Sequence, residues 1–78
     1  MIMVQSNEHM FVICICNDDY STSLEKRKIY EVLPDNDAAK HNQIRVIDES
    51  GEDYLYPAEY FVPVKLPKAT EQALVNAA

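Results

Sequence analysis

The sequence predicts a small, mainly β domain in which five antiparallel strands form a barrel. Short segments with apolar residues, alternating or continuous, recur along the chain, and turn-forming residues separate them. These segments are residues 10–16, 28–33, 43–48, 53–56 and 61–64. The length of 78 residues allows only one domain with a small core.

The first predicted strand is "MFVICIC", residues 10–16. Side chains alternate between the two faces of a strand, and both faces here are apolar, so we expect cover on both sides. Phe11, Ile13 and Ile15 are predicted to lie in the core. The segment "NDDYSTSLEKRK" that follows is polar and lacks sustained helical periodicity. It predicts a long, partly ordered loop.

The second predicted strand contains "IYEVL" and stops at Pro34, which cannot donate a hydrogen bond to a neighbouring strand. Its predicted core residues are Ile29, Val32 and Leu33. Ile29 and Val32 fall on opposite faces of a regular strand, so a bulge near Glu31 is expected. "PDNDAAKHN" then predicts a turn-rich connector.

Residues 43–56 are predicted to form a hairpin. "QIRVID" and "DYLY" alternate, and the only glycine of the chain, Gly51, lies between them, where it can adopt a positive φ angle. Ile44 and Val46 share one face of the third strand. The tyrosines of the fourth strand are expected to lie opposite them as core rings, with Leu55 pointing outwards.

The last part of the chain predicts a turn, a strand and a terminal helix. "PAEY" is too short for an α-helix and suits one 3-10 turn. Pro63 within the segment "FVPV" indicates an edge strand or the end of a strand, and "KATEQALVNAA" is expected to form a short helix or a frayed tail. We therefore divide the chain into an N-terminal segment, 1–9, whose order is left open, the barrel, 10–66, and a C-terminal helix or tail, 67–78.

Composition argues against several classes of function. With 13 acidic and 7 basic residues the net charge is −6, which repels phosphate backbones, and the basic run Lys26-Arg27-Lys28 is too short to reverse this. No apolar run approaches the roughly 18 residues of a membrane span, so a cytoplasmic location is expected. Cys14 and Cys16 are interpreted as small apolar fillers in a reducing compartment.

The sequence also predicts no enzymatic activity, no cofactor and no metal site. The two histidines are isolated in expected loops and do not form ligand pairs with the Cys-x-Cys segment. The cysteines lie within an apolar strand, which does not favour a reactive thiolate. Paired carboxylates lie in turns without calcium-loop spacing, where they most often only solvate the loops.

The order of the elements and the segment Tyr56-Pro57-Ala58-Glu59-Tyr60-Phe61 resemble an SH3-like β-barrel domain, in which a hydrophobic-Pro-x-x-Tyr-hydrophobic signature precedes the last strand. The resemblance covers about residues 10–64, and "CNDDY" stands at the entry to the long first loop. SH3 domains that bind proline-rich peptides use a tryptophan, and this chain has none. "RVIDESGEDYLYPAEYFVPV" also resembles a segment of short uncharacterised bacterial proteins, from which no function follows.

The resemblance implies that Tyr56 and Phe61 point inwards, whereas Pro57 and Tyr60 line an outer groove that Tyr20 can join. A ring set against a proline offers a flat apolar floor with a polar edge. The candidate binding residues are Asp18, Asp19, Tyr20, Glu25, Leu55, Pro57 and Tyr60. Two alternatives stay open: the groove binds a partner, or the N- or C-terminal segment of the chain itself covers it.

The function expected from these features is a non-catalytic protein–protein interaction module, whose partner is a protein or peptide segment, basic or apolar in character. The alternative is a structural subunit that forms homo-oligomers through the apolar terminal segments "MIMV" and "ALVNAA". Nucleic-acid binding through the few basic residues is a third reading, which the acidic composition disfavours.

Overall fold

The computed structural model of the chain describes residues 10–77, which form five β-strands, two α-helices and one 3-10 helix. The expectations for residues 1–9 lie outside the described residues. The elements in chain order are β1 (Met10–Cys14), β2 (Ile29–Leu33), α1 (Asn36–Lys40), β3 (Gln43–Ile47), β4 (Asp53–Pro57), η1 (Ala58–Tyr60), β5 (Phe61–Val64) and α2 (Lys68–Ala77).

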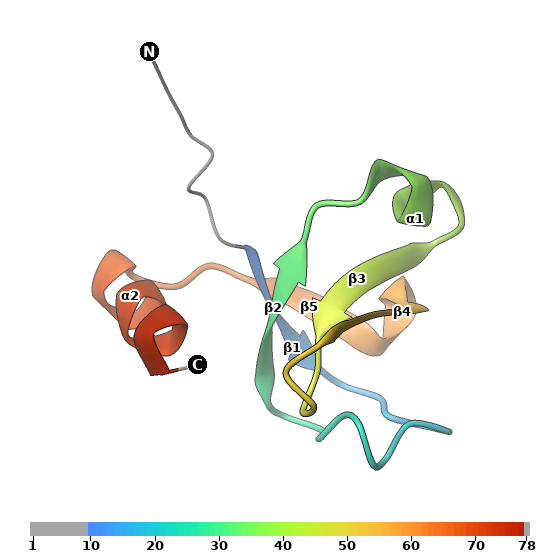
Figure 1. The fold of residues 1–78 in the computed structure, drawn as a ribbon, viewed down its shortest axis with the longest axis horizontal. Coiled ribbons are helices and arrows are strands. Elements are labelled where there is room, and N and C mark those ends of the chain that lie inside the picture. The colour runs from blue at the N-terminus through green and yellow to red at the C-terminus, as the bar shows by residue number, and fades with distance from the viewer. Residues whose placement is uncertain (1–9, 78) are drawn as a thin grey trace.

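The five strands form one antiparallel sheet in the order β4-β3-β2-β1-β5 (Figure 1). The last strand therefore pairs with the first, so the chain returns to its starting strand after the 3-10 helix. The predicted fold class is confirmed: the chain is mainly β, with five antiparallel strands, a 3-10 turn before the last strand and a short C-terminal helix. No ladder joins β4 to β5 in the described chain, so the sheet stays open between these edges.

The core lies on one face of this sheet. Its buried cluster consists of Val12, Cys14, Leu24, Tyr30, Val32, Val46, Tyr56 and Phe61. Tyr56 and Phe61 point inwards, as the sequence predicted, because both belong to the buried cluster. Ile44 and Val46 also share one face as predicted, since Val46 is fully buried and Ile44 packs against the cluster.

The assignment of the β1 faces from the sequence was wrong for Ile13 and Ile15. Val12 and Cys14 point into the core cluster, whereas Ile13 is half-buried on the other face and Ile15 is 53% exposed. The strand ends at Cys14, so Ile15 follows it as part of the loop. Both faces of the strand are apolar, so alternation alone did not reveal which one would meet the other buried strands.

For β2 the prediction was right for Val32 and wrong for Ile29 and Leu33. Tyr30 and Val32 are buried in the core, whereas Ile29 and Leu33 are half-buried on the opposite face. The strand pairs with β1 in an unbroken register: Met10 with Val32, Phe11 with Glu31, Val12 with Tyr30 and Ile13 with Ile29. The bulge expected near Glu31 is therefore absent from the β1–β2 ladder, because Tyr30 takes the core position that had been given to Ile29.

The connector after β2 contains helix α1, which the sequence reading had taken for turns. Asp35 is its N-cap, and a carboxylate oxygen of this residue accepts a hydrogen bond from the N–H of Ala38 at 2.9 Å. Ala38 is the buried residue of this helix. Arg45 of β3 donates to the other carboxylate oxygen of Asp35 at 2.8 Å. A short helix of 5 residues forms here because one carboxylate both caps it and ties it to the sheet.

The C-terminal helix α2 lies to one side of the sheet, apart from η1 and β4 (Figure 1). None of its residues is buried, and only Glu71 and Val75 are half-buried. Among residues 10–77, no helix has the length and apolar character needed to cross a membrane.

Candidate functional site

The long loop between β1 and β2 is held by one buried side chain and by local hydrogen bonds, whereas the sequence predicted only partial order. Leu24 is fully buried in the core cluster. The carbonyl of Tyr20 accepts hydrogen bonds from the N–H groups of Ser23 and Leu24, both at 2.9 Å, and the side-chain amide of Asn17 donates to the carbonyl of Leu24 at 3.0 Å. A buried leucine and local turns thus hold the loop against the sheet.

This loop brings Tyr20 onto the rings that follow β4. The ring of Tyr20 lies 4.9 Å from that of Tyr56, centroid to centroid, with the two planes perpendicular, and 6.0 Å from that of Tyr60. We call Tyr20, Tyr56 and Tyr60 the tyrosine cluster. Tyr56 is buried at its base, whereas Tyr20 and Tyr60 are half-buried and reach the surface.

The acidic part of the loop lies beside this cluster. The hydroxyl of Tyr60 donates a hydrogen bond to the backbone carbonyl of Asp18 at 3.2 Å. Burial raises the pKa of Tyr60, and the nearby acidic groups of Cys16, Asp18 and Asp19 raise it further because negative charge opposes formation of a phenolate. At neutral pH the surface therefore combines aromatic rings, a hydroxyl that keeps its proton and two exposed carboxylates.

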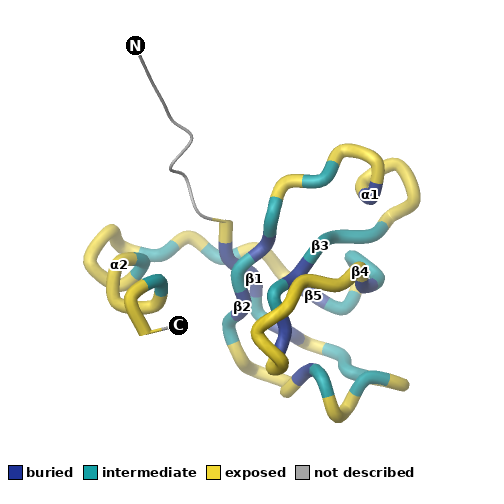
Figure 2. The backbone as a smooth tube through the Cα atoms, in the orientation of Figure 1, coloured by how far each residue is buried: buried dark blue, intermediate teal, exposed yellow. Residues whose placement is uncertain are grey.

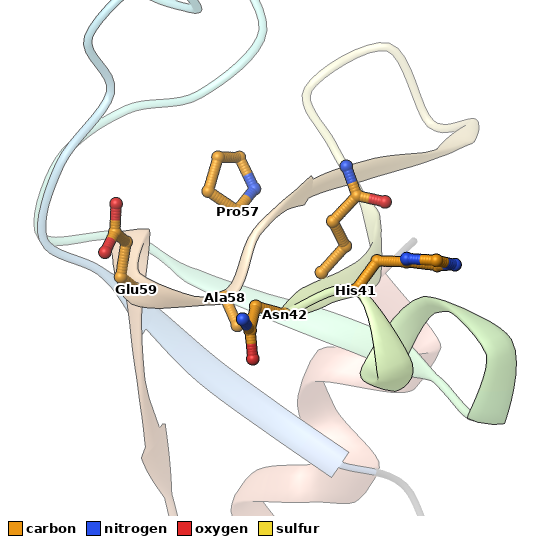
Figure 3. A pocket seen from close by; sticks show the side chains of 6 residues that line it. His41, Asn42, Pro57, Ala58 and Glu59 are labelled. Carbon is orange, nitrogen blue, oxygen red and sulfur yellow. The ribbon is translucent and has the colours of Figure 1, made fainter.

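Pro57, Ala58 and Glu59, which lie between Tyr56 and Tyr60 in the sequence, line one part of a shallow depression (Figure 3). Its volume is about 580 Å³, and its lining residues are His41, Asn42, Gln43, Pro57, Ala58 and Glu59. In the close-up, His41 and Glu59 lie at opposite ends, with Asn42 and Ala58 between them. The carbonyl of Asn42 accepts a hydrogen bond from the N–H of Ala58 at 2.9 Å, which joins the two sides of the floor.

The structure brings together some of the predicted binding residues. Tyr20, Tyr60 and Asp18 are in direct contact through the ring pair and the hydrogen bond, and Asp19 is close enough to affect the pKa of Tyr60. Pro57 is half-buried and lines the depression.

Glu25 and Leu55 lie elsewhere. The backbone N–H of Glu25 donates to the hydroxyl of Tyr30 at 2.8 Å, at the β2 end of the loop. Leu55 points outwards as expected and is 38% exposed, but it alternates with Tyr56 along β4 and so faces away from the cluster. We therefore leave both out of the candidate site.

Tyr54 was expected to be a core ring and is instead 50% exposed, so this prediction was wrong. It shares a face with Tyr56, but β4 is an edge strand, and the loop that covers Tyr56 does not bury Tyr54. The hydroxyl of Tyr54 donates to Glu52 at 3.1 Å.

The residues that the sequence reading missed are His41, Asn42, Gln43, Ala58 and Glu59. They come together because Asn42 adopts a φ of 58° where α1 turns into β3, and because β3 pairs Gln43 with Pro57. Asparagine tolerates this left-handed conformation better than most residues. An asparagine at this position is therefore a weak signal for a turn in the sequence. It does not predict which distant residues will lie next to that turn.

Two polar networks, one buried around Asp48 and one partly exposed around Glu49, stabilise the neighbouring loops. The carboxylate of Asp48 accepts hydrogen bonds from the N–H and the hydroxyl of Ser50, at 2.9 and 2.6 Å, and from the hydroxyl of Tyr56 at 2.6 Å. Burial favours the neutral acid, but these hydrogen bonds outweigh burial and hold the pKa of Asp48 below its ordinary value. Burial and the bond to Asp48 raise the pKa of Tyr56 to about 12.

The second network ties the loop to the hairpin. The hydroxyl of Tyr30 donates to Glu49 at 2.5 Å, and Lys28 contacts the same carboxylate at 2.6 Å. The hydrogen bonds from Lys28 and Tyr30 lower the pKa of Glu49. All the polar groups in the two networks have partners within the fold, so we regard both networks as structural.

The described residues contain no group of three or more His, Cys, Asp or Glu that could hold a metal ion. The thiol of Cys14 is buried and donates to the carbonyl of Cys16 at 3.2 Å, and burial raises its pKa, which disfavours the thiolate. Comparison of the chain with protein-family models, with curated proteins and with solved structures found no match. Function must therefore be inferred from the geometry of the side chains.

Proposed function

We propose that the protein is a non-catalytic protein–protein interaction module that binds a short basic segment of a partner protein on the tyrosine cluster. The observation that carries this proposal is the contact between Tyr20 and Tyr60, two half-buried rings, next to the exposed carboxylates of Asp18 and Asp19. Aromatic rings and carboxylates side by side suit a lysine or arginine, whose charge the carboxylates attract and whose stem packs on the rings.

Contacts within the chain hold this surface in place, which supports this function. Tyr20 rests on the buried ring of Tyr56, and Leu24 anchors the loop that carries it. The hydroxyl of Tyr60 is bonded to the backbone of the same loop. A partner that binds ordered rings immobilises few side chains, so less of the interaction free energy is lost to entropy.

The C-terminal helix does not cover the cluster, because α2 lies apart from η1 across the sheet (Figure 1). Of the two terminal segments that could have covered the groove, the described part of the C-terminal one therefore leaves it accessible. Residues 1–9 lie outside the described residues.

The depression lined by Pro57, Ala58 and Glu59 extends the proposed surface. Pro57 and Ala58 contribute apolar floor, and Glu59 adds a third exposed carboxylate at one end. A segment whose basic side chain lies on the tyrosine cluster would place a neighbouring residue over this depression. The chain has no tryptophan to form a wall of this surface, so we expect a dissociation constant in the micromolar range or weaker, or about −8 kcal/mol at best.

Chemical-shift mapping with a library of basic, proline-containing peptides tests the proposal. We expect shifts at Asp18, Tyr20 and Tyr60 that increase with peptide concentration and decrease with salt, because exposed charges are screened. A flat response across the library would contradict the proposal.

Matched variants separate the cluster from the rest of the surface. Tyr60→Ala should abolish the shifts, and replacing both Asp18 and Asp19 by asparagine should weaken binding of basic peptides. Tyr54→Ala is the control, because Tyr54 is also an exposed tyrosine but lies outside the cluster. Equal loss of binding in Tyr54→Ala and Tyr60→Ala, with both proteins folded, would show that the cluster is not the binding site.

A further inference from the structure

The two edges of the sheet differ in what they offer to another strand. At the β5 edge, the N–H of Ile15 donates to the carbonyl of Tyr60, so in the β1–β5 register the N–H groups of Val62 and Val64 also point towards β1. Phe61 and Pro63 therefore point outwards. The N–H of Phe61 is already bonded to Ala58, and proline has none. Within β5 the outer edge thus has no free donor.

The β4 edge has free donors and acceptors. The N–H of Asp48 donates to the carbonyl of Glu52, and the N–H of Ala58 donates to the carbonyl of Asn42. Bonded pairs alternate along an antiparallel ladder, so between these two bonds the residues of β4 that bond to β3 are Tyr54 and Tyr56. The N–H and C=O groups of Asp53 and Leu55 must then point away from the sheet. No other described residue bonds to these four backbone groups.

The side chains around this edge are accessible. Figure 2 shows β4 exposed over most of its length, and Tyr54 and Leu55, on opposite faces of the strand, are 50% and 38% exposed. The carboxylate of Asp53 contacts the guanidinium of Arg45 at 3.0 Å, which reduces its repulsion of another acidic strand. An unpaired edge flanked by exposed apolar side chains is a template for strand addition.

We propose that β4 pairs antiparallel with β4 of a second copy of this chain, about a two-fold axis that passes beside Tyr54. In this register Asp53 of each copy lies opposite Leu55 of the other. Each such pair exchanges two backbone hydrogen bonds, and all four outward groups of each copy are then bonded. The two Tyr54 rings face each other in a pair without backbone hydrogen bonds, where side chains are closest.

The spacing of the free groups favours a second copy as the occupant. They lie symmetrically about Tyr54, so the edge is complementary to itself under a two-fold rotation, which is the commonest symmetry of protein dimers. Because the β5 edge has no free donor, pairing of β4 edges ends at two copies and does not propagate into a fibre. Tyr56 of the tyrosine cluster lies on β4 but bonds to β3, whereas the groups that pair belong to Asp53 and Leu55, so the dimer does not depend on the proposed peptide binding.

The dimer should be weak and favoured by salt. Two strands of 5 residues bury less surface than a standard interface, and each copy carries a net charge of −6. Added salt screens this repulsion, so the dissociation constant should fall as the salt concentration rises. This is opposite to the effect of salt expected for binding of a basic peptide.

A dilution series of the whole chain followed by amide hydrogen exchange tests the proposal without any variant. We expect the N–H groups of Asp53 and Leu55 to become at least severalfold more protected as protein concentration rises, whereas that of Tyr54, bonded within the chain, does not change. A strict monomer near millimolar concentration in high salt would overturn the proposal. Protection that appears only when a basic peptide is added would assign the edge to a peptide and also overturn it.

Leu55→Pro removes the outward N–H without breaking a bond to β3, because Leu55 does not donate to that strand. We expect this variant to stay monomeric by sedimentation while keeping the circular dichroism spectrum of the parent. Leu55→Thr keeps the N–H and should still dimerise. Dimerisation of a folded Leu55→Pro protein would contradict the proposal, and the dilution series remains decisive if that variant fails to fold.

Discussion

The β3–β4 hairpin and the long β1–β2 loop contribute to the same core but depend on different interactions. The hairpin is held by a regular ladder and a turn in which Gly51 has a φ of 85°. The loop has no ladder of its own and is held by Leu24 in the core. At its far end, the carbonyl of Ser23 accepts a hydrogen bond at 3.1 Å from the N–H of Glu49 in the hairpin turn.

The difference shows that distant residues can supply the contacts that position a segment without regular structure. Alternation and turn chemistry fix the hairpin locally. The loop depends on partners that lie far away in the sequence, such as Glu49, whose N–H donates to the carbonyl of Ser23. Because the loop carries Tyr20 and Asp18, the candidate binding surface depends on this second, non-local kind of order.

The largest effect is expected from Leu24→Ala. Removing a fully buried leucine from the core cluster should lower the free energy of unfolding by about 3 kcal/mol. Urea denaturation measures this change, and Val46→Ala in the hairpin, also fully buried, should cost about 2 kcal/mol because fewer methyl groups are lost. A loss below about 1 kcal/mol for Leu24→Ala would mean that the loop is not part of the core.

Asp48→Asn should lower the free energy of unfolding by about 2 kcal/mol, because the carboxylate accepts three hydrogen bonds in a buried turn. The pKa of Asp48 is lower in the folded state than in the unfolded chain. The unfolded chain therefore binds more protons in acid, and the contribution of Asp48, present above about pH 4, is lost as pH falls below that value.

Unfolding measured from about pH 7 to pH 2 should show this loss, and Asp48→Asn should reduce the slope below about pH 4. Asp37→Asn is a control in an exposed position of α1. If Asp48→Asn leaves the pH dependence unchanged, the acid sensitivity comes from other carboxylates, such as Glu49.

Tyr30→Phe tests the link between the loop and the hairpin. The hydroxyl accepts from the N–H of Glu25 and donates to Glu49, so its removal should cost about 1.5 kcal/mol. Tyr54→Phe removes an exposed hydroxyl and should change the free energy of unfolding by less than about 0.5 kcal/mol. Equal effects of the two substitutions, measured by thermal unfolding, would show that the network around Glu49 does not hold the loop.

The smallest effect is expected from Gly51→Ala in the hairpin turn. A Cβ atom here would meet no atom within 4 Å, so the cost comes only from the φ of 85°. We expect a loss of about 1 kcal/mol by thermal unfolding, with the strand register unchanged. A loss of 3 kcal/mol or more would point to a contact of this turn that the structure does not contain.

Local patterns predicted the parts of the fold that depend on short segments. The register of the hairpin, the turn at Gly51, the 3-10 turn before β5 and the edge position of Pro63 all follow from residues next to one another. The pairing of Tyr20 with Tyr60 came instead from the resemblance to SH3-like domains, because these two residues lie 40 positions apart and no local pattern joins them. Local patterns did not reveal α1, because its cap at Asp35 depends partly on Arg45 in β3.

The sequence by itself therefore determined the strands, their order along the chain and the turns around Gly51 and before β5, because alternation and backbone restriction act within a few residues. The tertiary structure decided which face of β1 became the core and that Leu24 would anchor the loop. It also decided that Pro57 and His41 would line one depression. These outcomes depend on packing between distant segments, and where both faces of a strand are apolar, only that packing distinguishes them.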